Sequence, residues 1–231
     1  MGQYYRPVIF GFGFKRNKPE TITAVAGLNC YRFGNGAKLM EHSYVSNNYV
    51  NAVATLLAGK FKGRNFAWIG DYADTIDNTA GPDEEDNGTV NGYSLSTDEL
   101  EAATLPFIPT RYYCEDEAKK YERDNSIAVD NPYKYVLNDT KKQYVVIPDD
   151  EPDLWLIHPL PLLTCYGNGR GGGDYCPNPD KPEADKYAGK WAFDRITVAN
   201  EVPDGYKEIK PVFSEKYLDE HNAKVLAERE K

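Results

Sequence analysis

The clearest pattern in the chain is a helical repeat in residues 46–58. Apolar side chains recur every four residues from Val45 to Leu57, in the stretch "VSNNYVNAVATLL", which places them on one face of a helix. Ser46 is the expected N-cap, because its hydroxyl can accept a hydrogen bond from an early backbone N–H, and Gly59 is the expected end. The repeat therefore predicts an amphipathic helix with one side buried.

A second pattern, runs of β-branched and aromatic residues bounded by turn residues, predicts a sheet. These runs are residues 4–14, 21–33 and 65–72, a hairpin over 134–148 with Asn138 and Asp139 at its turn, and a strand over 189–199. Residues 154–166 are apolar but contain Pro159 and Pro161, so we expect an extended segment there, either at an edge of the sheet or as an irregular crossing.

Between and after these runs the sequence predicts polar connections and further helices. Residues 73–95 read as a long acidic loop, and 96–103 and 114–124 read as short helices. A final helix, 214–230, carries an apolar stripe and is expected to dock on the body. The predicted fold class is α+β: a mostly antiparallel sheet covered by a few helices.

Two glycine turns indicate an internal duplication within a single domain, 1–231. "FGNGAK" (33–38) and "YGNGRG" (166–171) share an aromatic-Gly-Asn-Gly core, and each is followed by an aromatic strand. This predicts related halves, 4–78 and 133–200, separated by an acidic insert, 79–131. The alternative is that short glycine turns recur by chance.

Composition adds an acidic, tyrosine-rich character. The formal net charge is −9, and tyrosine outnumbers phenylalanine by 18 to 9. The acidic residues are concentrated in short runs of a kind that is usually exposed to solvent. We expect these runs to contact a protein partner with a basic surface. The candidate partner-binding residues in these runs are Asp83, Glu84, Glu85, Asp86, Asp149, Asp150, Glu151 and Asp153. Such a surface repels phosphates, so direct nucleic-acid binding is not expected.

The sequence also predicts a cytoplasmic protein that does not cross a membrane. The apolar run near the start, Val8 to Phe14, has only seven apolar or glycine residues, whereas a spanning helix needs roughly 20. The four cysteines are too sparse for a disulfide scaffold, so we expect them to be reduced.

Several segments resemble an uncharacterised family of proteins from bacteria and their mobile elements. These segments are "MGQYY", "KLMEHS", "WIGDYAD", "LNDTKKQYV", "HPLPLLTCYGNGRGGGDY" and "GKWAFDRI". The resemblance covers most of the chain except the acidic insert, and it implies no particular mechanism. The family pattern has a glycine in "WAGDRI", where this chain has Phe193.

The glycine-rich loop that follows Tyr166 is the first candidate for a ligand site. Its residues Gly169, Arg170, Gly171, Gly172 and Asp174 combine backbone amides with one cation, the groups that bind phosphate. However, the loop lacks the Gly-Lys-Ser/Thr end of a P-loop, and Asp174 would repel an anion. The alternative is a loop whose glycines only permit a tight crossing.

Metal and catalytic signals are weaker. Cys165, Cys176 and His158 do not have zinc-ligand spacing, and a polar turn explains the carboxylates of "DYADTID" better than a magnesium site, so no metal or cofactor is predicted. If the halves are related, Asp71 and Asp194 could converge as a carboxylate pair with Arg195 nearby.

Taken together, these features favour a non-enzymatic binding protein. Examples are an accessory protein or an inhibitor that a phage or mobile element encodes. The alternative is a hydrolase or nucleotide-binding enzyme that uses loop 167–174. The lack of a recognised catalytic constellation in the sequence favours binding.

Overall fold

The computed structural model describes residues 3–22, 24–28, 30–33, 35–73, 132–149, 156–167, 174–175, 187–211, 223–224 and 226–230. The predicted helices 96–103 and 114–124, the acidic insert and nearly all of the loop 73–95 lie outside these residues. The predicted duplication also depends partly on residues outside them, and it stays a prediction.

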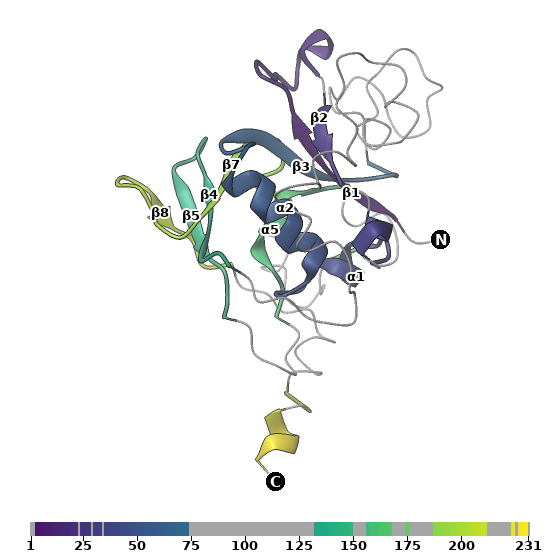
Figure 1. The fold of residues 1–231 in the computed structure, drawn as a ribbon, viewed down its shortest axis with the longest axis vertical. Coiled ribbons are helices and arrows are strands. Elements are labelled where there is room, and N and C mark those ends of the chain that lie inside the picture. Colours follow the sequence, from purple (N-terminus) through teal and green to yellow (C-terminus); the bar gives the residue numbers. More distant parts are fainter. Residues whose placement is uncertain are drawn as a thin grey trace.

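An eight-stranded sheet forms the centre of the molecule (Figure 1). The strands are β1 (Tyr5–Phe10), β2 (Ala24–Gly27), β3 (Arg64–Gly70), β4 (Tyr135–Asn138), β5 (Gln143–Val146), β6 (Cys165–Tyr166), β7 (Arg195–Ala199) and β8 (Lys207–Glu208). Their order is β2-β1-β3-β7-β4-β5-β8, and β6 pairs separately with the end of β3. All pairs are antiparallel except β3–β6 and β5–β8. The predicted α+β class is therefore confirmed.

The helices within the described residues are α1 (Leu39–His42), α2 (Asn48–Ala58) and α5 (Pro159–Thr164), with short 3-10 turns η1 (Pro19–Thr21) and η2 (Cys30–Phe33). The helix predicted at 46–58 is α2, but Asn47 caps it: the Asn47 side chain accepts hydrogen bonds from the backbone N–H groups of Tyr49 and Val50. Ser46 has φ 69°, a left-handed conformation, whereas an N-cap residue is normally extended.

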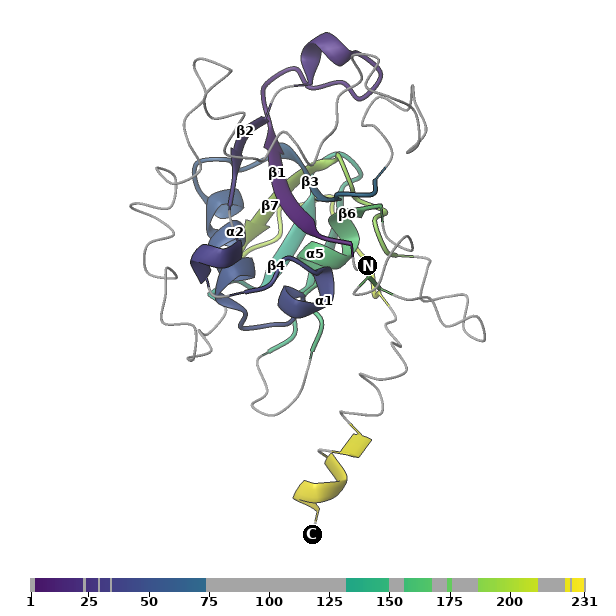
Figure 2. The same ribbon diagram turned by 90° about the vertical axis from the view of Figure 1, so that its right-hand side faces the viewer.

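The core is divided between the two faces of β1 and β3, because successive side chains of a strand point to opposite sides. On the face that we call the helical face, Ile9 and Trp68 pack against α2 and α5 in the larger cluster. On the opposite face, Phe10 and Ile69 belong to a much smaller cluster. Figure 2 shows α1, α2 and α5 beside the strands.

The structure corrects the prediction for residues 154–166. Residues 159–164 form α5 instead of an extended segment, and the two prolines lie in its first turn, where backbone N–H groups need no helical partner. His158 precedes the helix, and its ring Nδ1 accepts a hydrogen bond from the Leu160 N–H at 3.0 Å.

Other boundaries also differ from the prediction: only 5–10 of the strand expected at 4–14, and only 24–27 of the one expected at 21–33, form strands. The strand expected at 189–199 begins only at Arg195, because residues 187–194 form turns in which Gly189 has φ 70° and Phe193 has φ 69°. At the C-terminus, the described residues 223–224 and 226–229 are helical but exposed, and Leu226 is 47% exposed, so they do not show the expected docking.

Candidate functional site

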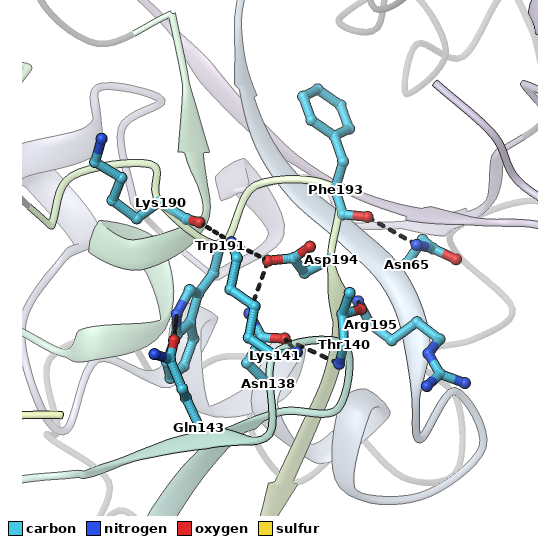
Figure 3. Close-up of polar contacts among 10 residues, drawn as sticks. All are labelled: Asn65, Asn138, Thr140, Lys141, Gln143, Lys190, Trp191, Phe193, Asp194 and Arg195. Carbon is cyan, nitrogen blue, oxygen red and sulfur yellow. Dashed lines mark hydrogen bonds and ion pairs between the residues drawn. The ribbon is translucent and has the colours of Figure 1, made fainter. Parts of the chain in front are cut away.

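Asp194 lies where the turns 187–194 meet the β4–β5 hairpin (Figure 3). One oxygen of its carboxylate accepts hydrogen bonds from the Asn138 side chain at 2.7 Å and from the Lys141 ammonium at 2.6 Å. The Asp194 side chain is 17% exposed and the Lys141 side chain 44% exposed. The carboxylate therefore connects the hairpin to the start of β7.

Arg195 follows Asp194 but points away from it (Figure 3). Its backbone N–H donates to the Thr140 hydroxyl at 2.9 Å, and its exposed guanidinium donates to the Asp139 carbonyl at 3.4 Å. Two further bonds fix the preceding turn: the Trp191 indole donates to Gln143 at 3.2 Å, and the Asn65 side chain donates to the Phe193 carbonyl at 2.7 Å. These contacts are those of a packed junction between strands.

Phe193 holds an unusual conformation at this junction. A bulky residue rarely adopts its φ of 69°, which glycine adopts freely. The strain is offset on the opposite face of the sheet, where the Phe193 ring is 7% exposed and its centroid lies 4.8 Å from that of Tyr166. The Arg16 guanidinium carbon also lies 4.7 Å from the ring centroid. Phe193 therefore adds ring packing at a left-handed turn position.

Asp139 forms a second polar junction next to the first. Its two carboxylate oxygens accept hydrogen bonds from the hydroxyls of Thr197 at 2.7 Å and Tyr206 at 2.5 Å. Burial and the hydrogen bond to Asp139 raise the pKa of Tyr206 to about 12, so its hydroxyl remains a donor at neutral pH.

Asp71 does not converge with Asp194. It follows the last residue of β3, where its carboxylate accepts the Tyr4 backbone N–H at 2.9 Å. Asp194 instead lies beside the start of β3, because its backbone carbonyl accepts the Phe66 N–H at 3.0 Å. Five residues of strand separate these points, which is about 16 Å. The predicted carboxylate pair is therefore not formed.

Asp174 is buried, at 2% exposed, beside Tyr5 and Cys165. Burial and then the charge of Asp174 raise the pKa of both the Tyr5 hydroxyl and the Cys165 thiol, so the thiol stays protonated. The thiol donates to the Leu162 carbonyl at 3.2 Å. Cys165 is thus a packed thiol and not an activated nucleophile.

Gly167 begins the glycine-rich loop at φ 101°, and a Cβ there would lie only 2.8 Å from the Gln3 side chain. This close approach agrees with the crossing role considered for the loop's glycines. The candidate ligand residues Gly169, Arg170, Gly171 and Gly172 lie outside the described residues. Of the candidate partner-binding carboxylates, Asp149 is described and is exposed, and the others also lie outside.

No protein-family model, curated protein or solved structure matches this chain.

The described residues hold no group of three or more His, Cys, Asp or Glu side chains that could bind a metal ion. None of the helices in the part of the chain that the structure describes has the length and apolarity to cross a membrane. His42 and His158 are fully buried, and burial lowers the pKa of each to about 3, so both are neutral. Neither ring is placed to exchange protons with a substrate in solvent.

The sequence analysis did not predict the partners of Asp194. It also did not predict that two turns rich in lysine and arginine lie at the same end of the sheet. Asn138 and Lys141 were predicted only as parts of a hairpin turn, and no local pattern connects them to a residue more than fifty positions away. The basic end had a signal in the turns "KRNK" and "KFKGR", but nothing in the sequence places these turns side by side.

Proposed function

We propose that this protein is a non-enzymatic binding protein, which uses its acidic, tyrosine-rich surface to engage a protein partner with a basic surface. The acidic runs at 82–88, 114–117 and 148–153 supply the charge for such an interface, and Asp149, in the last of them, is exposed just after β5. A surface of this kind accelerates and orients association with a basic partner. The acidic charge also fits an accessory protein or an inhibitor whose carboxylates occupy a basic site of another protein.

The main observation behind this proposal is that three described carboxylates, those of Asp71, Asp174 and Asp194, make structural contacts. Asp71 caps the β1–β3 pair, Asp174 is buried against Tyr5, and Asp194 is bonded to Asn138 and Lys141. Each carboxylate has a structural contact, and Asp71 and Asp194 lie at different ends of β3. A catalytic pair would need to converge on one substrate-accessible point, so the arrangement supports binding over hydrolysis.

The experiment starts from capture of partners from a bacterial lysate by the full chain, their identification, and measurement of affinity with the purified partner. A variant with Asp→Asn and Glu→Gln changes at 83–86 and 149–153 is expected to bind at least tenfold more weakly, with a shallower salt dependence. The control removes an equal number of carboxylates elsewhere, including Glu201, Asp204 and Glu228. Equal affinity of the two variants would contradict the proposal.

A further inference from the structure

The end of the sheet that includes the start of β3 gathers two basic turns. The loop 11–18 follows β1, and the turn 59–63 leads into β3 at Arg64. Because β1 and β3 are antiparallel, with Ile9 opposite Phe66, the two turns lie at the same end. The guanidinium carbon of Arg64 lies 3.0 Å from the centroid of the Phe12 ring, so the two turns are in contact.

The charge of this end is opposite to that of the chain as a whole. Lys15, Lys18, Lys60 and Lys62 are exposed, and Glu20 is the only carboxylate within residues 11–22 and 59–64, both of which the structure describes. The exposed Arg195 continues the basic surface, because it lies opposite Asn65 on the neighbouring strand. The nearby carboxylates Asp139 and Asp194 are already engaged by Tyr206, Thr197, Asn138 and Lys141.

Aromatic side chains are interleaved with these cations. Phe12 is 88% exposed, in a tight turn where Gly13 has φ 80° and open space around it. On the opposite face of the sheet, Arg16 donates to the Tyr166 hydroxyl at 2.8 Å, and its guanidinium carbon lies 4.9 Å from the Tyr166 ring centroid. An exposed ring beside cations is costly to leave in water, and it is the arrangement that stacks on bases while cations contact phosphates.

Arg64 gives independent support for an anionic ligand. Its Nη1 atom is buried and has no hydrogen-bond partner among the described residues. Loss of solvent around the guanidinium lowers the pKa of Arg64 from its ordinary value. A guanidinium that has lost part of its solvent is stabilised by the charge of a nearby phosphate or carboxylate.

We propose that this basic end, formed by residues 11–18 and 59–64 together with Arg195, binds single-stranded nucleic acid. The lysines contact backbone phosphates, and Phe12 stacks on a base. The site revises the expectation of no direct nucleic-acid binding, and it is independent of the proposed acidic interface. An acidic protein could bind the same lysines without base stacking, and competition with polyglutamate in the second test distinguishes the two ligands.

The first test measures binding of the full chain to a fluorescein-labelled oligothymidylate of about 20 nucleotides by fluorescence anisotropy, from about 50 to 200 mM salt. A variant carrying Lys15→Gln, Lys18→Gln and Lys62→Gln is expected to bind more weakly, with a log–log salt slope smaller by about 2. Its matched control, Lys134→Gln, Lys210→Gln and Lys224→Gln, has the same net charge and is expected to retain the slope. Equal losses of affinity and of salt slope in the two variants would contradict the proposed site.

The second test separates stacking from charge. Phe12→Ala is expected to weaken binding about tenfold without changing the salt slope, while Phe12→Trp retains affinity. Phe12 is exposed, so thermal melting should be the same for both variants. Polyglutamate of the same length serves as a competitor. No oligothymidylate binding at about 50 mM salt, unchanged affinity of Phe12→Ala, or displacement by polyglutamate at equal concentration would each overturn the proposal.

Discussion

The helical face and the opposite face of β1 and β3 differ in what covers their side chains. On the helical face, α2 and α5 bury a large apolar cluster around Trp68, where the His42 ring stacks at 5.3 Å and the Tyr49 ring meets the indole edge-on at 5.6 Å. On the opposite face, a few aromatic rings lie under Arg16, whose guanidinium carbon is 4.7 Å from the Phe193 ring centroid.

This difference separates stability from recognition. The buried histidines of the helical face have no contact with solvent, so they can affect the molecule only through its folding free energy. The opposite face and the adjoining basic end combine planar rings with exposed cations, which can be bound by a partner without unfolding. Substitutions on the two faces should therefore produce different kinds of effect.

The largest expected effect is acid sensitivity of the helical face. Below pH 6.5 the unfolded chain protonates His42 and His158, but the folded chain does not do so until about pH 3. Stability is therefore lost as the pH falls through this window, by about 1.4 kcal/mol per pH unit for each histidine, or about 5 kcal/mol for both at about pH 4.5. Urea unfolding at a series of pH values measures this slope.

His42→Phe keeps a ring against Trp68 but removes one titrating group. It should remove half of the pH dependence between 6.5 and 4.5 that the two histidines contribute. A slope equal to that of the unsubstituted chain would show that the pH dependence comes from other groups.

The second effect concerns the Asp194 junction. Asp194→Ala leaves the amide of the buried Asn138 without its acceptor and is expected to cost about 2 kcal/mol of unfolding free energy. Asp194→Asn retains an acceptor oxygen and should cost less than 1 kcal/mol, since the partner Lys141 is 44% exposed and its charge is well screened.

Asp204→Ala removes an exposed carboxylate and serves as the control for Asp194→Ala. If Asp194→Ala melts like the control, the junction carries no stability, and the interpretation of Asp194 as a structural residue fails.

The smallest expected effect is on the relative stability of two variants at position 193. A glycine variant is usually less stable than an alanine variant, and here we expect the opposite. Phe193→Ala and Phe193→Gly both remove the ring, so they share the loss of packing against Tyr166. Only glycine relaxes the left-handed backbone, so Phe193→Gly should be about 1 kcal/mol more stable than Phe193→Ala. Thermal melting of the two variants measures this difference, and a more stable alanine variant would show that φ relaxes on substitution.

Local patterns predicted the fold class, α2 and the β4–β5 hairpin, because each depends on a repeat within about fifteen residues. Two predictions were wrong in segments where proline or glycine is compatible with more than one local structure. Prolines that end a strand also fit the first turn of a helix, as in α5. Likewise, the apolar run before Arg195 contains Gly189, whose left-handed φ of 70° belongs to a turn and not to a strand.

The candidate sites depended on contacts that local patterns do not contain. Asp194 and Lys141 are joined only because β4 and β7 pair, and Phe12 meets Arg64 only because β1 and β3 pair. The hypothesis of an Asp71–Asp194 pair assumed equivalent strand ends, whereas the two residues lie at opposite ends of β3.

The placement of β3 also affects how the chain is made. Its neighbour β7 begins 125 residues after β3 ends. At the usual rate of synthesis, about 5–20 residues per second, β3 waits roughly 6 to 25 s on the ribosome before β7 exists. During that time the β2-β1-β3 unit has an unpaired edge at Arg64 and Asn65, so nascent chains are expected to need a chaperone or low local concentration to avoid joining one another.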